Sequence, residues 1–239
     1  MIPRHIHYVW VGSALPEKQR SYVETWRATN PDYKLTQWDE SNIDFSMPLI
    51  QQAYDRRQWS KVADIARLAA VLQHGGIYLD TDFALLKSLD PLLQHQCFYG
   101  FQYEFHPTDW IANGAFGAVP GHWFVKKAMD RILSMRSSRL GLERPTAFGP
   151  KLITKLLRDE GLRDHMYSPQ GTHIRDIFLC PTQVFYPYQA HEEFTEACVR
   201  PDTLAAHHWE KSWDKDIPKV LRIARSARNT MRRLFNVAR

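Results

Sequence analysis

The sequence predicts an α/β fold with a mostly parallel, doubly wound sheet. Short segments rich in β-branched and aromatic residues alternate with longer segments whose apolar residues recur at helical spacing. Strands that alternate with helices form sheets covered by helices on both faces. At 239 residues, the chain is long enough for one large domain of this kind. We expect a single domain over residues 1–213 and a separate segment over 214–239.

The individual elements follow from local signals along the chain. Strands are expected over 6–11, 34–38, 77–79, 98–101, 115–119, 177–179 and 203–209. Helices are expected over 17–29, 48–59, 61–74, 122–135 and 148–159. Pro16 starts the first helix, Ser60 is the expected cap of the third, and Gly75 with Gly76 ends that third helix.

The composition excludes several classes of protein. With 44% hydrophobic and 24% charged residues, the chain is typical of a globular protein rather than a disordered one. No secretory signal and no apolar run of about 18 residues are present, so we expect a cytoplasmic protein without a membrane-spanning helix. The three widely spaced cysteines predict neither a disulfide framework nor a zinc site. No pattern for nucleic-acid binding appears in the domain.

The net charge of +5 is concentrated in the C-terminal segment, where residues 215–239 hold eight basic residues and one acidic residue. From 217 to 239, apolar residues recur every three or four positions, at Val220, Ala224, Ala227, Met231, Leu234 and Ala238. This pattern predicts a basic amphipathic helix that can lie on an anionic membrane surface. The alternative is that the apolar stripe packs on the domain or on a second copy; the oligomeric state is not legible in the sequence.

Two carboxylates follow the expected strand 77–79, in the tripeptide Asp80-Thr81-Asp82. Side chains at positions i and i+2 of an extended segment point the same way. Their charges repel unless a cation lies between them. A hard divalent cation with open coordination positions would relieve the repulsion and could bind a diphosphate on its other side. We therefore expect a metal site here, the alternative being a solvated acidic loop.

The residues before this tripeptide give it a specific context. Asp64 and Arg67 share one face of the expected helix 61–74. The run Ala63-Asp64-Ile65-Ala66-Arg67, followed by Gly75-Gly76-Ile77-Tyr78-Leu79-Asp80-Thr81-Asp82, resembles the DXD sugar-binding glycosyltransferases of family 32. Further similar segments lie at 2–10, 26–38, 113–122, 148–150 and 207–213, so the resemblance spans residues 2–213. Phe148 departs from the family pattern, which has Thr there.

The resemblance implies a GT-A glycosyltransferase fold, a single Rossmann-like nucleotide-binding domain that uses Mn²⁺ or Mg²⁺. It implies transfer of a hexosyl group from a nucleotide-sugar donor, a UDP- or GDP-sugar, with retention of configuration. The expected acceptor is a saccharide or a lipid-linked saccharide, in the synthesis of a bacterial capsular or other surface polysaccharide. An enzyme of this kind would be cytoplasmic, or peripheral at the inner membrane face.

Several residues are expected at the donor by the same resemblance. Trp10 would stack on the base, Asp64 would bond the hydroxyls of the donor sugar, and Arg67 would meet the sugar or the phosphates. Two residues near the C-terminal end of the domain would contact the leaving diphosphate, namely Ser212 and Trp213. The structural alternatives are a core position for Trp10 and a surface ion pair between Asp64 and Arg67.

The metal and the acceptor are assigned in the same way. Asp82 would bind the metal directly, and Asp80 would contact the ribose and sugar as well as the metal. His207 and His208 would lie on opposite faces of the last expected strand, so we expect only one of them to bind the metal. The family pattern favours His207. Asn113 has an expected role on the acceptor side, the alternative being that it caps a turn.

Two other functions would use the same residues. One is a non-catalytic scaffold that binds a nucleotide sugar, and the other is a metal-dependent hydrolase of sugar nucleotides. The intact set of Asp64, Arg67, Asp80, Asp82 and His207 argues against the scaffold. The hydrolase would need an activated water, and the sequence shows no evident general base for it. Glycosyl transfer is therefore the favoured hypothesis.

Overall fold

A computed structural model describes residues 1–108, 110–135 and 148–210. Ser212, Trp213 and the expected helix in 214–239 lie outside the described residues.

A seven-stranded sheet crosses the described chain in the order β2-β1-β3-β6-β5-β8-β7. Its strands are β1 His5–Val9, β2 Lys34–Trp38, β3 Gly76–Leu79, β5 Cys97–Phe101, β6 Ile111–Ala118, β7 Thr172–Ile174 and β8 Ile177–Cys180. A separate two-stranded ribbon pairs β4 Phe83–Leu85 with β9 Ala205–His207.

The main sheet is mixed, but most of its strands run in one direction. β1 pairs in parallel with both β2 and β3, and β5 pairs in parallel with β8. β6 runs antiparallel between β3 and β5, and β7 is antiparallel at the edge. Only β6 and β7 are therefore reversed among the seven strands of this sheet, which confirms the predicted α/β fold with a mostly parallel sheet.

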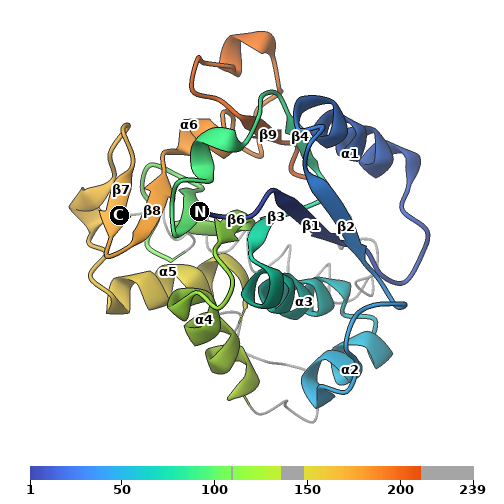
Figure 1. The fold of residues 1–239 in the computed structure, drawn as a ribbon. Helices are drawn as coiled ribbons and strands as arrows, with labels where there is room; N and C mark the ends of the chain where they lie inside the picture. The colour runs from blue at the N-terminus through green and yellow to red at the C-terminus, as the bar shows by residue number, and fades with distance from the viewer. Residues whose placement is uncertain (109, 136–147, 211–239) are drawn as a thin grey trace, which may run out of the picture.

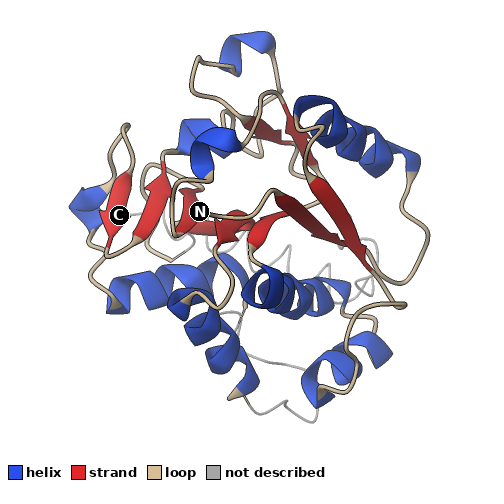
Figure 2. Ribbon diagram, in the orientation of Figure 1, coloured by secondary structure: helices blue, strands red, loops and turns tan. Residues whose placement is uncertain are grey.

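Helices cover both faces of the sheet (Figures 1 and 2). The described helices are α1 Glu17–Thr29, α2 Pro48–Asp55, α3 Trp59–His74, α4 Trp123–Leu133, α5 Gly149–Asp159 and the short α6 Thr182–Phe185. Alternation along β3 separates two cores: Tyr78 packs with residues of α2 to α5, whereas Ile77 and Leu79 pack with residues of α1, α6 and the ribbon. Among the described helices, none is long and apolar enough to span a membrane.

Some local predictions need correction. α3 begins at Trp59 with Gln58 before it and no side-chain cap, so Ser60 lies inside the first turn instead of capping the helix. The last strand covers 205–207 rather than 203–209. The three-residue strands β4 and β7 were not expected at all, because segments this short carry no readable periodicity.

β6 is irregular where it passes the end of β3. Tyr99 of β5 pairs with Phe116, but the next residue, Gly100, pairs with Ala112. Residues 113–115 therefore bulge out of the β5–β6 ladder. Bulges of this kind often redirect side chains next to functional sites. Here the bulge contains Asn113, and it lies beside the backbone of Asp80, whose N–H donates to the carbonyl of Gly114 at 2.7 Å.

Candidate active site

A cavity of about 630 Å³ opens at the carboxyl ends of β1 and β3. This is the edge at which α/β sheets commonly bind ligands. Trp10 follows β1, Asp80 and Asp82 follow β3, and all three line the cavity. The cavity is also lined by Asp64 and Arg67 from α3. The structure therefore brings together residues that the sequence singled out at widely separated positions.

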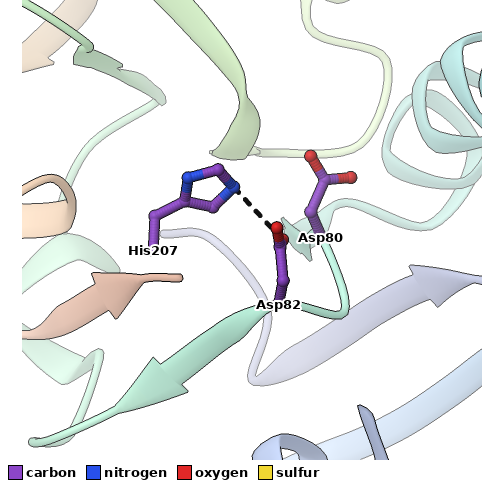
Figure 3. Close-up of side chains that lie close together, drawn as sticks. All are labelled: Asp80, Asp82 and His207. Atoms are coloured by element: carbon purple, nitrogen blue, oxygen red, sulfur yellow. Dashed lines mark ion pairs between the residues drawn. The ribbon is translucent and has the colours of Figure 1, made fainter. Parts of the chain in front are cut away.

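The β4–β9 ribbon carries His207 to the tripeptide. β4 starts directly after Asp82, and its first residue, Phe83, pairs with His207. The backbone N–H of His208 donates to the carbonyl of Asp82 at 2.8 Å. As a result, Nε2 of His207 lies 3.1 Å from Oδ1 of Asp82, and the imidazole ring points toward the carboxylate (Figure 3).

Asp80, Asp82 and His207 form a group that could hold a divalent cation. Each offers one ligand atom, and the three atoms lie within 4.8 Å of one another. Two carboxylates and one imidazole suit Mn²⁺ or Mg²⁺ and leave coordination positions for a substrate. The second carboxylate oxygen of Asp82 accepts the backbone N–H of Glu210 at 2.9 Å, which fixes its orientation. The described residues give Nδ1 of His207 no hydrogen-bond partner.

His208 faces away from this group. Its ring stacks on Tyr22 of α1, with centroids 4.8 Å apart and planes inclined by 11°. Its Nδ1 lies 3.1 Å from the hydroxyl of Tyr188. The expected alternation along the last strand therefore holds, and the geometry favours His207 over His208 as a metal ligand.

The carboxylate of Asp80 is held by three neighbours. The hydroxyl of Tyr78 donates to its Oδ1 at 2.8 Å, and Nη2 of Arg67 lies 3.2 Å from the same oxygen. A Cβ on Gly114 would lie 2.6 Å from Oδ2, so only glycine leaves room for the carboxylate in this position. Burial raises the pKa of Asp80 and the charge of Asp82 adds to the rise, while Arg67 opposes it.

Arg67 is buried and uses its whole guanidinium within the protein. Its side chain is 7% exposed, so the surface ion pair considered as an alternative is wrong. Nη1 donates to the carbonyl of Asn113 at 2.8 Å and Nε to that of Ala63 at 3.2 Å. Nη2 lies 3.5 Å from Oδ1 of Asp64. Burial would lower the pKa of Arg67, but the surrounding negative charges outweigh burial and keep it fully protonated.

Asn113 and Asp64 form one wall of the cavity with Arg67. The side-chain amide of Asn113 donates to Oδ1 of Asp64 at 2.9 Å. Burial raises the pKa of Asp64, and the charge of Arg67 and the amide of Asn113 oppose that rise. Because Asn113 lies in the strand bulge and bonds across to α3, it does not serve as a turn cap. Its role toward an acceptor stays a prediction.

Trp10 also lines the cavity and is only partly buried, so it is not a core residue. Its indole N–H donates to Oγ of Ser13 at 3.3 Å. The loop beyond it turns at Gly12, where φ is +86° and a Cβ would lie 2.7 Å from the ring of Trp59. Trp10 and Trp59 thus both line the cavity beside this loop, where a flat apolar base could be stacked.

The sequence reasoning missed several residues that line the cavity, including Tyr186, Trp209, Glu210 and Gln102. Tyr186 follows α6 and is 3% exposed. Burial raises the pKa of its hydroxyl, and the charges of Asp80 and Asp82 raise it further. No spacing or motif distinguishes this tyrosine in the sequence; its place in the site depends on how α6 packs between the sheet and the ribbon.

Comparison with protein families finds the glycosyltransferase sugar-binding region containing DXD motif over residues 16–99. The matched region includes α3, β3 and the two aspartates of the tripeptide. The chain thus carries the sugar-binding region of the DXD glycosyltransferases over residues 16–99. This finding confirms the resemblance drawn from the sequence motifs.

Proteins similar to this chain include viral and fungal glycosyltransferases. An uncharacterized glycosyltransferase of Acanthamoeba polyphaga mimivirus is 26% identical over 222 residues, which cover 89% of this chain and 84% of the viral protein. Inositol phosphoceramide mannosyltransferase 3 of Schizosaccharomyces pombe is 32% identical over 136 residues, which cover 55% of this chain and 37% of the yeast protein. The chain therefore spans little more than a third of the length of that yeast relative.

A solved structure supports the same fold. The PaToxG glycosyltransferase superposes with a TM-score of 0.54 at 17% identity, over 67% of this chain and 69% of the other. The described chain thus has the GT-A fold that the sequence resemblance implies.

Proposed function

We propose that the chain is a metal-dependent hexosyltransferase that moves a sugar from a nucleotide-sugar donor to a saccharide or lipid-linked saccharide. The observation that carries this proposal is the Asp80, Asp82 and His207 group at the edge of the cavity, with its ligand atoms within 4.8 Å of one another. A metal-binding group of this kind beside a roughly 630 Å³ cavity fits a substrate that contains a diphosphate.

Asp82 and His207 would hold a Mn²⁺ or Mg²⁺ ion, with Asp80 completing the group. The ion, when bound, would neutralise the negative charge that grows on the leaving nucleoside diphosphate. Arg67 keeps Asp80 and Asp64 in place through contacts of 3.2 and 3.5 Å and adds a fixed positive charge beside the diphosphate. Because these groups are held by the fold before substrate binds, little reorganisation is needed during transfer.

The cavity would hold the base of the donor beside Trp10 and Trp59. The sugar of the donor would lie beside Asp64 and Asn113. The carboxylate of Asp64 can accept hydrogen bonds from sugar hydroxyls, because only one of its oxygens receives the Asn113 amide among the described contacts. Both UDP- and GDP-sugars are candidates. The name of the yeast relative makes GDP-mannose a donor worth testing first.

The test is a thermal-shift and calorimetric screen of UDP and GDP, each with and without Mn²⁺, followed by turnover of the matching sugar nucleotides. A ligand that binds only the folded state raises its apparent stability. We expect binding that requires the metal, and sugar release that is much faster with an acceptor than without. Binding without any turnover would favour a scaffold, and acceptor-independent release would favour a hydrolase. Absence of binding to either nucleotide would contradict the proposal.

We propose that transfer proceeds with retention of configuration, on the family resemblance alone. An α-linked donor should give an α-glycoside. The anomeric coupling constant of the isolated product, measured by NMR, decides this point, and a β product would contradict a retaining mechanism.

We further propose that residues 217–239 attach the enzyme to an anionic membrane, where a lipid-linked acceptor for a capsular or other surface polysaccharide would lie. The support is the charge and spacing of the sequence, since these residues lie outside the described structure. Each basic residue near an anionic surface contributes about 1 kcal/mol, an effect that salt screens. Co-sedimentation with anionic and neutral liposomes tests it. Equal binding by the full chain and by a chain that ends at Trp213 would contradict it.

A further inference from the structure

Tyr186 occupies a central position between the metal-binding group and the sheet. Its ring meets the ring of His207 edge-on, with centroids 5.4 Å apart and planes at 64°. It also packs against Phe83 at 5.7 Å and Trp209 at 5.6 Å. These partners come from both strands of the ribbon and from the segment that follows it. Tyr186 therefore contacts the elements that bring His207 to Asp82.

The main chain and a glycine of β5 hold this tyrosine in one place. The N–H of Tyr186 donates to the carbonyl of Thr182 at 2.7 Å, at the C-terminal end of α6. A Cβ on Gly100 would lie 3.4 Å from Cε2 of Tyr186, so the ring lies directly on the sheet. With 3% of the residue exposed, the side chain has little freedom to change rotamer.

The hydroxyl of Tyr186 makes no hydrogen bond with another described residue, and the side chain lines the cavity. The other tyrosines beside the site are paired: Tyr78 donates to Asp80, and the hydroxyl of Tyr188 lies 3.1 Å from Nδ1 of His208. A buried tyrosine normally finds a partner for its hydroxyl. The partner of Tyr186 should therefore be a ligand in the cavity.

We infer that the hydroxyl of Tyr186 donates a hydrogen bond to the diphosphate of the bound nucleotide, beside the metal-binding group of Asp80, Asp82 and His207. This inference rests on the function proposed above. A phosphate oxygen is the acceptor that best fits this place, because the metal-binding group attracts a diphosphate and a phenol can only donate to an anion. The bond would strengthen as negative charge develops on the leaving group, so Tyr186 would act as a catalytic residue.

The variant Tyr186→Phe tests the inference because it keeps the ring contacts with His207 and removes only the hydroxyl. We expect its affinity for UDP or GDP in the presence of Mn²⁺, whichever nucleotide the wild-type enzyme binds, to fall about tenfold by isothermal titration calorimetry. That loss corresponds to about 1.4 kcal/mol, close to the lower limit for a hydrogen bond to a charged group. The affinity for the uncharged nucleoside should not change. The matched control is Tyr188→Phe, which removes a hydroxyl directed at His208 and should bind like the wild type.

The possible results separate this inference from the proposed function. If the wild type binds the diphosphate with Mn²⁺ and Tyr186→Phe binds it equally well, the inference is wrong and the proposed function stands. An equal loss of affinity for nucleoside and diphosphate would indicate that Tyr186 only supports packing, and would also overturn the inference. If the wild type binds neither UDP nor GDP, both proposals fall. A selective loss for the diphosphate, with an unchanged melting temperature, supports the inference.

Discussion

Nε2 of His207 lies 3.1 Å from Oδ1 of Asp82, although Asp82 follows β3 and His207 ends β9 near the end of the described chain. The contact depends on the antiparallel pairing of β4 with β9, which places Phe83 opposite His207. A two-stranded ribbon of three-residue strands is marginal without further packing. Here the rings of Phe83, Tyr186 and Trp209 surround His207 and supply that packing.

We predict that Asp82→Asn abolishes transfer and leaves the fold intact. An amide is a poorer ligand for a hard cation than a carboxylate, and the Mn²⁺-dependent affinity for the nucleoside diphosphate should be lost with it. The control is Asp159→Asn, an exposed residue that pairs with Lys155 on the surface of α5. Retention of more than about a tenth of the wild-type rate, equivalent to about 1.4 kcal/mol of barrier or less, would contradict a direct role in metal binding.

The core of this site could be predicted from the sequence because its signals are local. Asp64 and Arg67 lie on one turn of a helix with clear periodicity. Asp80 and Asp82 follow an apolar strand that begins at a pair of glycines. The strands and helices up to residue 79 were placed to within a few residues for the same reason. The assignment of residue roles still rests on family resemblance, because geometry alone does not show which group meets which part of a donor.

The remaining parts of the site depend on contacts between distant segments. Nothing in the sequence around Phe83 indicates a strand, because its partner β9 lies more than a hundred residues later. Tyr186 is one of ten tyrosines, and only the packing of α6 distinguishes it. The bulge at Asn113 likewise results from the pairing of β6 with both β3 and β5, which a linear pattern cannot reveal.

For Arg67, we predict that lysine is as damaging as alanine. The guanidinium donates to Asn113 and Ala63 through different nitrogens and contacts Asp80 through the third, and a single ammonium group cannot reproduce this geometry. The loss should appear mainly in kcat, by at least tenfold, with a lowered melting temperature because a buried carboxylate loses its partner. Arg27→Lys, in an exposed pair with Glu24, serves as the control. Wild-type kcat in Arg67→Lys would show that its charge alone is sufficient.

Gly114→Ala should weaken metal binding without removing any ligand. The new Cβ would lie 2.6 Å from Oδ2 of Asp80, so the carboxylate must move away from its position beside Tyr78 and Arg67. We expect at least a tenfold loss of Mn²⁺ affinity, measured by calorimetry with the nucleotide present. Gly121→Ala is the matched control, since its Cβ would meet nothing within 4 Å and its cost is backbone strain at φ +70°. Equal Mn²⁺ affinity in Gly114→Ala and the wild type would show that Asp80 tolerates displacement.

Below neutral pH, the stability of the enzyme should depend on His7, which is fully buried on β1. Nδ1 of His7 accepts the indole N–H of Trp38 at 3.2 Å, so its proton is on Nε2, which donates to the carbonyl of Gly75 at 2.8 Å. The neutral ring therefore joins β1, β2 and the end of α3, just before β3, the strand that Asp80 follows. Burial lowers the pKa of His7 from 6.5 to about 3, and the charge of His5 adds to this effect.

The pKa of His7 is lower in the folded protein than in the unfolded chain, so the unfolded chain binds more protons between about pH 6.5 and pH 3. The free energy of unfolding therefore falls as the pH falls through this range. One proton of difference corresponds to about 1.4 kcal/mol per pH unit. We predict that the unfolding free energy of the wild type, from urea titrations, drops by about 1 kcal/mol more between pH 6 and pH 5 than that of His7→Gln. The exposed His191 provides the control, and His191→Gln should follow the wild-type curve. A His7→Gln curve with the same slope as the wild type would show that His7 does not carry this pH dependence.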